Sequence, residues 1–155
     1  MKVIVFDIDG VLADATHRVH YVTGEKKDWD AFYEACDKDE PIIKNVKLLD
    51  ILLCGRYDDD GNKQYEIALL TGRPEKLRVK TVLWFINKCD VIITAIPMFM
   101  RKDNDYRPDY VVKKELAEQC IGLENILCVF EDRDRVVKMW RENDVQCHQT
   151  CDGTY

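Results

Sequence analysis

The sequence predicts an α/β fold in which a central, mostly parallel sheet of five strands carries helices on both faces. Short runs of β-branched and other apolar residues alternate along the chain with segments whose apolar residues recur at helical spacing. This alternation is typical of a parallel sheet, because a crossover helix must return the chain to the start of each new strand. A length of 155 residues suits one domain, and we expect residues 1–155 to form it.

Five short apolar runs are predicted to be strands buried on both sides. In chain order they are residues 3–6, 67–70, 91–93, 126–130 and, with a weaker pattern, 145–147. Apolar residues at helical spacing predict helices over residues 42–53, 77–86 and 109–117, and a further helix that starts over residues 136–140. Gly55 ends the first of these helices, Pro74 stands where the second begins, and Asp109 is placed to cap the third.

Two segments interrupt the alternation of strands and helices. Residues 14–40 hold a polar stretch and a predicted short helix over residues 29–36, and they are too few for an independent domain. We therefore expect them to form a minimal, cap-like insertion. Residues 55–65 are predicted to be a polar loop, because the run Asp58-Asp59-Asp60 lacks the alternating spacing and terminal glutamate of a calcium-binding loop.

Composition narrows the classes of function. The chain has 23 basic and 29 acidic residues, a net charge of −6, which argues against broad binding of polyphosphate but permits a small basic pocket. No apolar run approaches the roughly 18 residues of a membrane span, and the N-terminus does not resemble a signal peptide. The odd number of cysteines, seven, predicts reduced thiols in a cytoplasmic protein.

Reactive side chains stand at the carboxyl ends of the predicted strands. Asp7-Ile8-Asp9-Gly10 follows the first strand, Thr71-Gly72-Arg73 follows the second, and Glu131-Asp132 follows the fourth, with Lys113 on the preceding helix. Taken singly, each of these residues also has a purely structural explanation. The aspartates and the threonine could form a turn or cap a helix, and the lysine could lie on a solvated helix face. Together they predict one site, because the carboxyl ends of parallel strands share one edge.

These residue types suit phosphoryl transfer. One carboxylate can attack phosphorus to form an aspartyl-phosphate, and a second, two residues on, can protonate the leaving alcohol and later activate water. Because two carboxylates and a phosphate repel one another, a cation is needed, and Asp7 and Asp132 offer the hard oxygen ligands that Mg²⁺ prefers. Lys113 adds a fixed positive charge, and Thr71 with nearby backbone N–H groups can hold phosphoryl oxygens.

In this order, the motifs resemble the four motifs of the haloacid dehalogenase-like phosphatases, which have a three-layer, Rossmann-like fold. Within that superfamily the chain is similar, nearly end to end, to the 3′-phosphatase domain of phage-type polynucleotide kinase/phosphatases. The closer similarity rests on Arg18, Arg101 and the segments 27–33, 107–115 and 131–140.

The resemblance implies a role for each residue. The implied catalytic residues are Asp7 as nucleophile, Asp9 as general acid/base, and Lys113. The implied phosphate- and substrate-binding residues are Thr71, Gly72, Arg73, Arg18, Arg101 and Asp109, of which Asp109 also orients Lys113. The implied ligands of Mg²⁺ are Asp7, Asp132, Glu131 through water, and the backbone carbonyl of Asp9.

We therefore expect an Mg²⁺-dependent phosphatase that acts through an aspartyl-phosphate, with a 3′-phosphate on a polynucleotide end or nucleotide as substrate. The nearest alternative is a phosphatase of free mononucleotides or other small phosphate esters. A non-catalytic phosphoacceptor domain and a nucleic-acid-binding module, both from other classes, stay open. The chain has no P-loop motif, so we do not expect kinase activity from it. The sequence is compatible with a separate kinase that acts as a partner in trans, and it shows no sign of an obligate protein partner.

Overall fold

The computed structural model describes residues 1–23, 25–91 and 93–153. Its main sheet has the strand order β5-β4-β1-β6-β7, and all four neighbouring pairs are parallel. The strands are β1 (Val3–Phe6), β4 (Glu66–Pro74), β5 (Met98–Arg101), β6 (Ile126–Arg133) and β7 (Cys147–Gly153). The predicted α/β fold with a five-stranded parallel sheet is confirmed.

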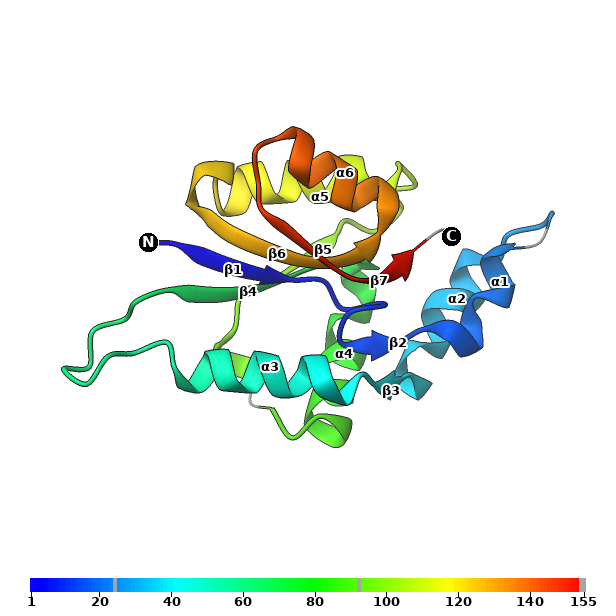
Figure 1. Cartoon of the computed structure of the whole chain (residues 1–155). Coiled ribbons are helices and arrows are strands. Elements are labelled where there is room, and N and C mark those ends of the chain that lie inside the picture. Colours follow the sequence, from blue (N-terminus) through cyan, green and yellow to red (C-terminus); the bar gives the residue numbers. More distant parts are fainter. Residues whose placement is uncertain (24, 92, 154–155) are drawn as a thin grey trace.

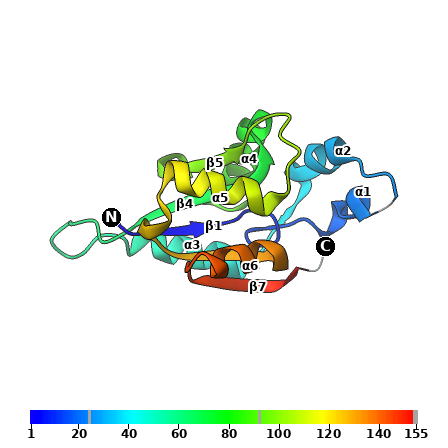
Figure 2. The ribbon, with the colours of Figure 1, turned by 90° about the horizontal axis from the view of Figure 1, so that it is seen from above.

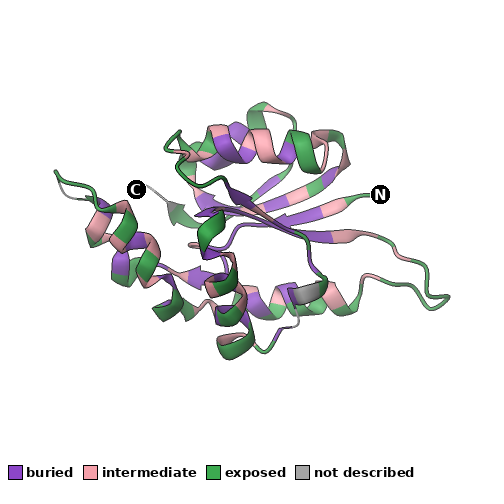
Figure 3. Cartoon of the chain, turned by 180° about the vertical axis from the view of Figure 1, so that it is seen from behind, coloured by how far each residue is buried: buried purple, intermediate pink, exposed green. Residues whose placement is uncertain are grey.

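Helices cover both faces of this sheet and give the molecule three layers (Figure 1). The helices are α3 (Ile43–Cys54) and α4 (Arg78–Lys88) on one face, and α5 (Asp109–Cys120) and α6 (Asp134–Glu142) on the other. Alternate residues of β1 enter different cores: Ile4 and Phe6 pack with residues of α3 and α4, whereas Val5 packs with residues of α5 and α6. Figure 3 shows the resulting burial of the central strands.

The segment between β2 (Ala13–Asp14) and β3 (Glu40–Pro41) forms a small cap, as expected. These two strands pair antiparallel, and between them lie α1 (His20–Thr23), α2 (Trp29–Glu34) and the 3₁₀ turns Thr16–Arg18 and Ala35–Lys38. Figure 1 shows the cap helices beyond the end of the sheet toward which β1 runs. The cap therefore stands next to the edge where the sequence predicts the site.

The prediction of a strand over residues 91–93 is wrong. Ile93–Ala95 forms a 3₁₀ turn, position 92 lies outside the described residues, and the third parallel strand is β5 instead. Val91 and Ile93 are buried in the core that includes α3 and α4. These residues are apolar because they belong to a connection that packs into this core. A buried connection and a short buried strand show the same apolar pattern in the sequence, so the pattern does not distinguish them.

The last strand begins later than predicted. Strand β7 starts at Cys147, while Val145 is a buried loop residue whose N–H donates to the Trp140 carbonyl (3.1 Å). Residues 55–65 form no part of the main sheet, and the Asp58 carboxylate organises this loop by accepting two backbone N–H groups. All seven cysteines are free, and no described helix has both the length and the apolar character to cross a bilayer.

Replacing Leu69 by alanine tests the packing of the central strands. Leu69 lies in β4 beside β1 and is fully buried. Its loss should lower the free energy of unfolding by about 2–5 kcal/mol, measured by urea denaturation, because a cavity replaces the methyl groups. Ile51→Ala, on an exposed position of α3, is the control and should cost less than about 0.5 kcal/mol. An equal loss of unfolding free energy in the two variants would contradict the placement of Leu69 in the core.

Candidate active site

The site forms where the path of the chain across the sheet reverses. The chain runs outward from β1 to β4 and β5, then crosses back to β6 on the other side of β1. In open α/β sheets, ligands bind outside the carboxyl ends of the strands at such a reversal. Asp7 follows β1 directly, and its N–H donates to the Phe130 carbonyl of β6 (3.0 Å).

Gly10 shapes the loop that follows Asp7. Its φ of +78° lies in the left-handed region that glycine adopts readily. A Cβ built on Gly10 would lie only 2.1 Å from Oδ2 of Asp132. The close approach of Asp132 to the loop after β1 therefore depends on the absence of a side chain at position 10.

Lys113 joins three carboxylates at the centre of the site. Its buried Nζ donates to Asp7 Oδ2 (2.8 Å) and Glu131 Oε2 (2.7 Å) and lies 3.3 Å from Asp109 Oδ2. Burial alone would lower the pKa of Lys113, but Asp109, Asp7 and Glu131 raise it well above its ordinary value. The amine is therefore charged.

Asp7, Glu131 and Asp132 could together hold a metal ion. All three are buried, and one carboxylate oxygen from each lies within 4.8 Å of the others. Burial raises the pKa of Asp7 to about 6, against the opposing effect of Lys113. Oδ1 of Asp7 is buried with no hydrogen-bond partner among the described residues, and a metal cation could coordinate it. Hard oxygen ligands with excess negative charge fit Mg²⁺.

The carboxylate of Asp9 belongs to a second cluster. Its Oδ1 accepts hydrogen bonds from Arg18 Nη2 (2.6 Å) and Arg73 Nε (3.0 Å), and both arginines are fully buried. Burial alone would raise the pKa of Asp9, but the charges of Arg73 and Arg18 outweigh burial and hold it well below its usual range. Because this carboxylate points to the arginines, the proposed metal contact of Asp9 depends on its backbone carbonyl and stays a prediction.

Asp39, which the sequence did not single out, completes this second cluster. Its fully buried Oδ2 accepts from Arg18 Nη2 (2.6 Å) and Arg73 Nη2 (2.9 Å), and its backbone carbonyl accepts from Trp84 Nε1 (2.8 Å). Two carboxylates thus balance two guanidinium groups, as buried charges require. Asp39 stands in a polar run that is typical of a solvated turn, so no local signal distinguished it.

We expected Arg18, Arg73 and Arg101 to hold the substrate, but in the structure each bonds to the protein itself. Arg101 donates through Nε to the Gly72 carbonyl (2.9 Å) and through Nη2 to Asp109 Oδ1 (2.8 Å). A Cβ on Gly72 would lie 2.3 Å from the same Asp109 oxygen, so glycine permits this approach. Contacts of the three arginines with substrate stay predictions.

Thr71 lies at the same edge of the sheet as Asp7. The register pairs Phe6 of β1 with Leu69 of β4, so Thr71 stands two residues beyond that pair. It is fully buried, and its Oγ1 accepts from the Arg73 N–H (3.2 Å). That bond leaves the hydroxyl hydrogen available to a ligand oxygen.

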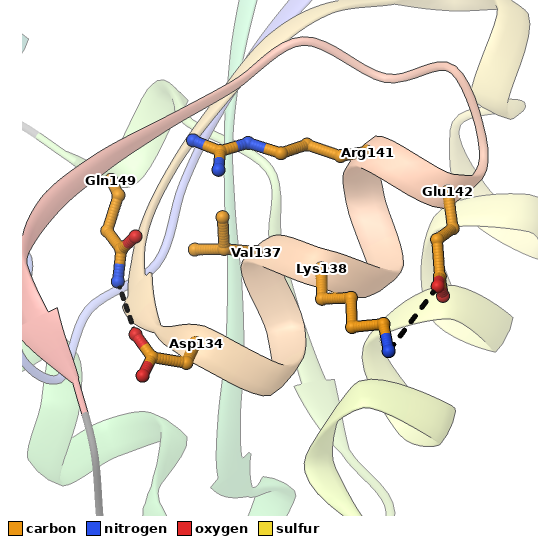
Figure 4. Close-up of a pocket in the computed structure, with 6 residues that line it drawn as sticks. All are labelled: Asp134, Val137, Lys138, Arg141, Glu142 and Gln149. Atoms are coloured by element: carbon orange, nitrogen blue, oxygen red, sulfur yellow. Dashed lines mark hydrogen bonds and ion pairs between the residues drawn. The ribbon is translucent and has the colours of Figure 1, made fainter.

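A cavity of about 730 Å³ opens beside these clusters, between the cap and residues 101–110, and Arg101 and Asp109 are on its wall. A separate hollow of about 460 Å³ adjoins α6 (Figure 4). Several of its polar groups already have partners, as in the Gln149–Asp134 hydrogen bond (2.7 Å) and the bond from Arg141 to the Cys147 carbonyl (3.2 Å), and it holds none of the predicted site residues. The first cavity is therefore the candidate substrate site.

The fold and the family model that matches the chain together define the class of protein, that of the haloacid dehalogenase-like phosphatases. A class C acid phosphatase from Bacillus anthracis matches with a TM-score of 0.64 at 13% identity, over 99% of this chain and 68% of that one. A haloacid dehalogenase-like hydrolase from Streptococcus pneumoniae matches with a TM-score of 0.57 at 14% identity, over 95% and 83%. At these identities the likeness shows the fold alone.

Within this class, the family model for the polynucleotide kinase PNKP phosphatase domain matches residues 1–155, and the chain belongs to that family. Two chains from structures of the Pnkp1/Rnl/Hen1 complex are 26% and 25% identical, with TM-scores of 0.75 and 0.77 over 99% of this chain. A protein of Autographa californica nuclear polyhedrosis virus, named as a bifunctional polynucleotide kinase/RNA ligase, is 28% identical over 91% of this chain. This chain spans 43%, 46% and 18% of their respective lengths.

Replacing Asp39 by asparagine tests whether the second cluster positions Asp9. The variant keeps the shape of the side chain but removes the charge that holds Arg18 and Arg73 in place. We expect kcat for hydrolysis of p-nitrophenyl phosphate to fall about 10- to 100-fold, because small misplacements of a catalytic group are costly. Asp37→Asn, at an exposed position of the same turn, should leave kcat unchanged. An unchanged kcat in a folded Asp39 variant would contradict this role.

Asp7→Asn tests the electrostatics of the metal-free site. A carboxyl group whose pKa is raised from 3.8 to about 6 by folding destabilises the folded state increasingly as pH rises through that interval. With EDTA present, the variant should therefore have a higher Tm than the wild type at pH 8. The gain should shrink to about half at pH 5, which lies between the two pKa values, because Asp7 is then mostly protonated in the folded state but already ionised in the unfolded chain. The same gain at both pH values would show that the charge of Asp7 is not its cause.

Proposed function

We propose that this chain is an Mg²⁺-dependent phosphomonoesterase that removes 3′-phosphates from polynucleotide ends. The observation that carries the proposal is the meeting of Asp7, Lys113, Glu131 and Asp132 at one edge of the sheet, in a chain of the PNKP phosphatase family. Relatives named for polynucleotide kinase activity and for RNA repair support a nucleic-acid end as substrate. We take residues 1–155 as one domain, with residues 14–40 as its cap.

In the proposed reaction, Asp7 attacks phosphorus and forms an aspartyl-phosphate while the bond from phosphorus to the 3′ oxygen breaks. Asp9 gives its proton to that departing oxygen. In the second half, Asp9 takes a proton from water as the water oxygen attacks phosphorus, which releases inorganic phosphate and restores the Asp7 carboxylate. Mg²⁺ held by Asp7, Asp132 and Glu131 would offset the negative charge that accumulates on the phosphoryl oxygens.

Other groups of the site support this chemistry. The charged amine of Lys113 keeps one oxygen of Asp7 in place and can also attract a phosphoryl oxygen. In the free protein, Arg73 and Arg18 hold the pKa of Asp9 low, so Asp9 is a carboxylate. A phosphate dianion that arrives nearby acts in the opposite direction, because like charges raise the pKa of a carboxyl group. Asp9 therefore takes up its proton more readily with substrate bound.

A second candidate is a phosphatase of free mononucleotides or small phosphate esters, favoured by the net charge of −6. A non-catalytic phosphoacceptor domain would also use strand-end carboxylates and a lysine, but it would have no need of a second carboxylate at Asp9 to protonate a leaving group. A nucleic-acid-binding module would have no need of the buried cluster around Lys113. A kinase partner in trans and a cytoplasmic location stay predictions.

Matched substrates distinguish these possibilities. The purified protein with Mg²⁺ is offered one oligonucleotide bearing either a 3′- or a 5′-phosphate, together with 3′- and 5′-mononucleotides. We expect the 3′-phosphorylated oligonucleotide to have at least about a tenfold advantage in kcat/KM, and Asp7→Asn or EDTA to abolish phosphate release. Equal rates on mononucleotides would favour the second candidate. Phosphate release from the 5′-phosphorylated oligonucleotide alone would refute the proposed 3′ specificity. No phosphate release from any substrate would refute the proposal that the chain is a phosphatase.

A further inference from the structure

The last strand, β7, contacts both segments that carry the candidate metal ligands. The Oγ1 atom of Thr150 lies 3.4 Å from the Glu131 carbonyl oxygen at the end of β6 and 3.5 Å from the Gly10 carbonyl oxygen in the loop after Asp7. Figure 2 shows β7 beside α6, ending at the same end of the molecule as the cap helices. The end of β7 therefore stands at the junction between the loop after β1 and the end of β6.

An irregularity in the pairing of β7 brings it to this junction. Glu131 pairs with Gln149 and Arg133 pairs with Gly153, so β7 advances four positions while β6 advances two. Extra residues in a strand bend it and change the direction of its side chains, and they are frequent next to active sites. Here they fall within residues 150–152, the part of β7 that reaches the loop after β1.

Gln149, just before this irregularity, holds the backbone of Asp132. Its Nε2 donates to the Asp132 carbonyl oxygen (3.0 Å) and to Oδ1 of Asp134 (2.7 Å). Because a side-chain amide has two N–H donors, both bonds form at once. Figure 4 shows the amide of Gln149 reaching from β7 to Asp134 at the start of α6. Asp134 thus keeps the amide in the orientation in which it faces the Asp132 carbonyl.

Both polar groups of the Asp132 backbone are held by side chains. Its N–H donates to Oε1 of Glu131 (3.2 Å), and its carbonyl accepts from Gln149. Fixing the two peptide groups that flank a residue fixes the direction of its side chain, and the carboxylate of Asp132 lies in the acidic cluster with Asp7 and Glu131. Groups that orient a metal ligand in this way influence the affinity for the metal.

We propose that Gln149 is a positioning residue for the metal ion, because it holds the backbone of Asp132 so that the carboxylate faces Asp7 and Glu131. The inference rests on the proposed function, since it concerns the metal site of that phosphatase. Gln149 acts through Asp132 and has no part in the bond-making steps. Mg²⁺ requires nearly ideal octahedral geometry, so a small rotation of one carboxylate weakens its binding.

Binding of Mn²⁺ tests this inference without turnover. Mn²⁺ also prefers oxygen ligands, and electron paramagnetic resonance measures its free concentration during a titration of the purified protein. Gln149→Met keeps the length of the side chain and removes both N–H donors. The Kd for Mn²⁺ should rise about 2- to 12-fold, the equivalent of one net hydrogen bond. Because Gln149 is exposed, its replacement leaves the core intact.

Two further variants assign the measured change to the metal site. Gln146→Met, at an exposed glutamine just before β7 whose amide bonds to His148, is the matched control and should keep the wild-type Kd. Asp132→Asn should lose the part of Mn²⁺ binding that Mg²⁺ displaces, which identifies the site that is measured. In Gln149→Met, the Mg²⁺ concentration that gives half-maximal hydrolysis of p-nitrophenyl phosphate should rise by the same factor as the Kd for Mn²⁺.

The outcomes separate this inference from the proposed function. If Gln149 only stabilises the fold, Gln149→Met will lower the Tm in EDTA and keep the wild-type Kd for Mn²⁺; the inference is then wrong and the proposed phosphatase stands. An equal loss of affinity in Gln146→Met would also contradict a specific role of Gln149. If the wild type binds no Mn²⁺ that Mg²⁺ displaces, the metal site of the proposed function fails, and the inference fails with it.

Discussion

The buried amine of Lys113 is the interaction on which the rest of the site depends. It contacts carboxylates from three elements, namely Asp7 after β1, Asp109 at the start of α5 and Glu131 in β6. Carboxylates placed this closely in a buried region repel one another, and removal of their shared cation would leave uncompensated charge. One lysine does not balance them all, which explains why a divalent cation fits beside Asp7 and Asp132. The amine and the metal would thus divide the task of holding the nucleophile in place.

The second cluster differs from the first in how its carboxylate charges are compensated. Asp9 and Asp39 offset the charges of Arg18 and Arg73, so the carboxylates of this cluster find their counter-charges within the protein. Arg18 and Asp39 both come from the cap segment, whereas Arg73 comes from β4. The small cap therefore does more than cover the sheet edge, because it supplies half of the cluster that orients the proposed acid/base.

Patterns within the sequence were reliable where the structure depends on neighbours along the chain. The buried strand before Asp7, the apolar spacing of α3 and the insertion between β2 and β3 were all predicted. The error at residues 91–93 arose because an apolar connection packed under a sheet has the same composition as a short buried strand. Asp39 was missed for a similar reason, since a charged residue in a polar run is usually solvated.

The sequence by itself determined the alternation of strands and helices and placed the reactive residues at the carboxyl ends of their strands, because both depend on local periodicity and spacing. It ended two strands too early, since Thr71 and Arg73 lie within the last residues of β4, and Glu131 and Asp132 within those of β6. Only the tertiary structure decided which of those residues share a cluster and which way their charged groups point. Asp9 meets Arg73 across 64 positions and Arg18 meets Asp39 across 21, and such pairs form through burial and charge balance that no local pattern records. The same holds for the cavity, whose walls become neighbours only when the cap folds against the edge of the sheet.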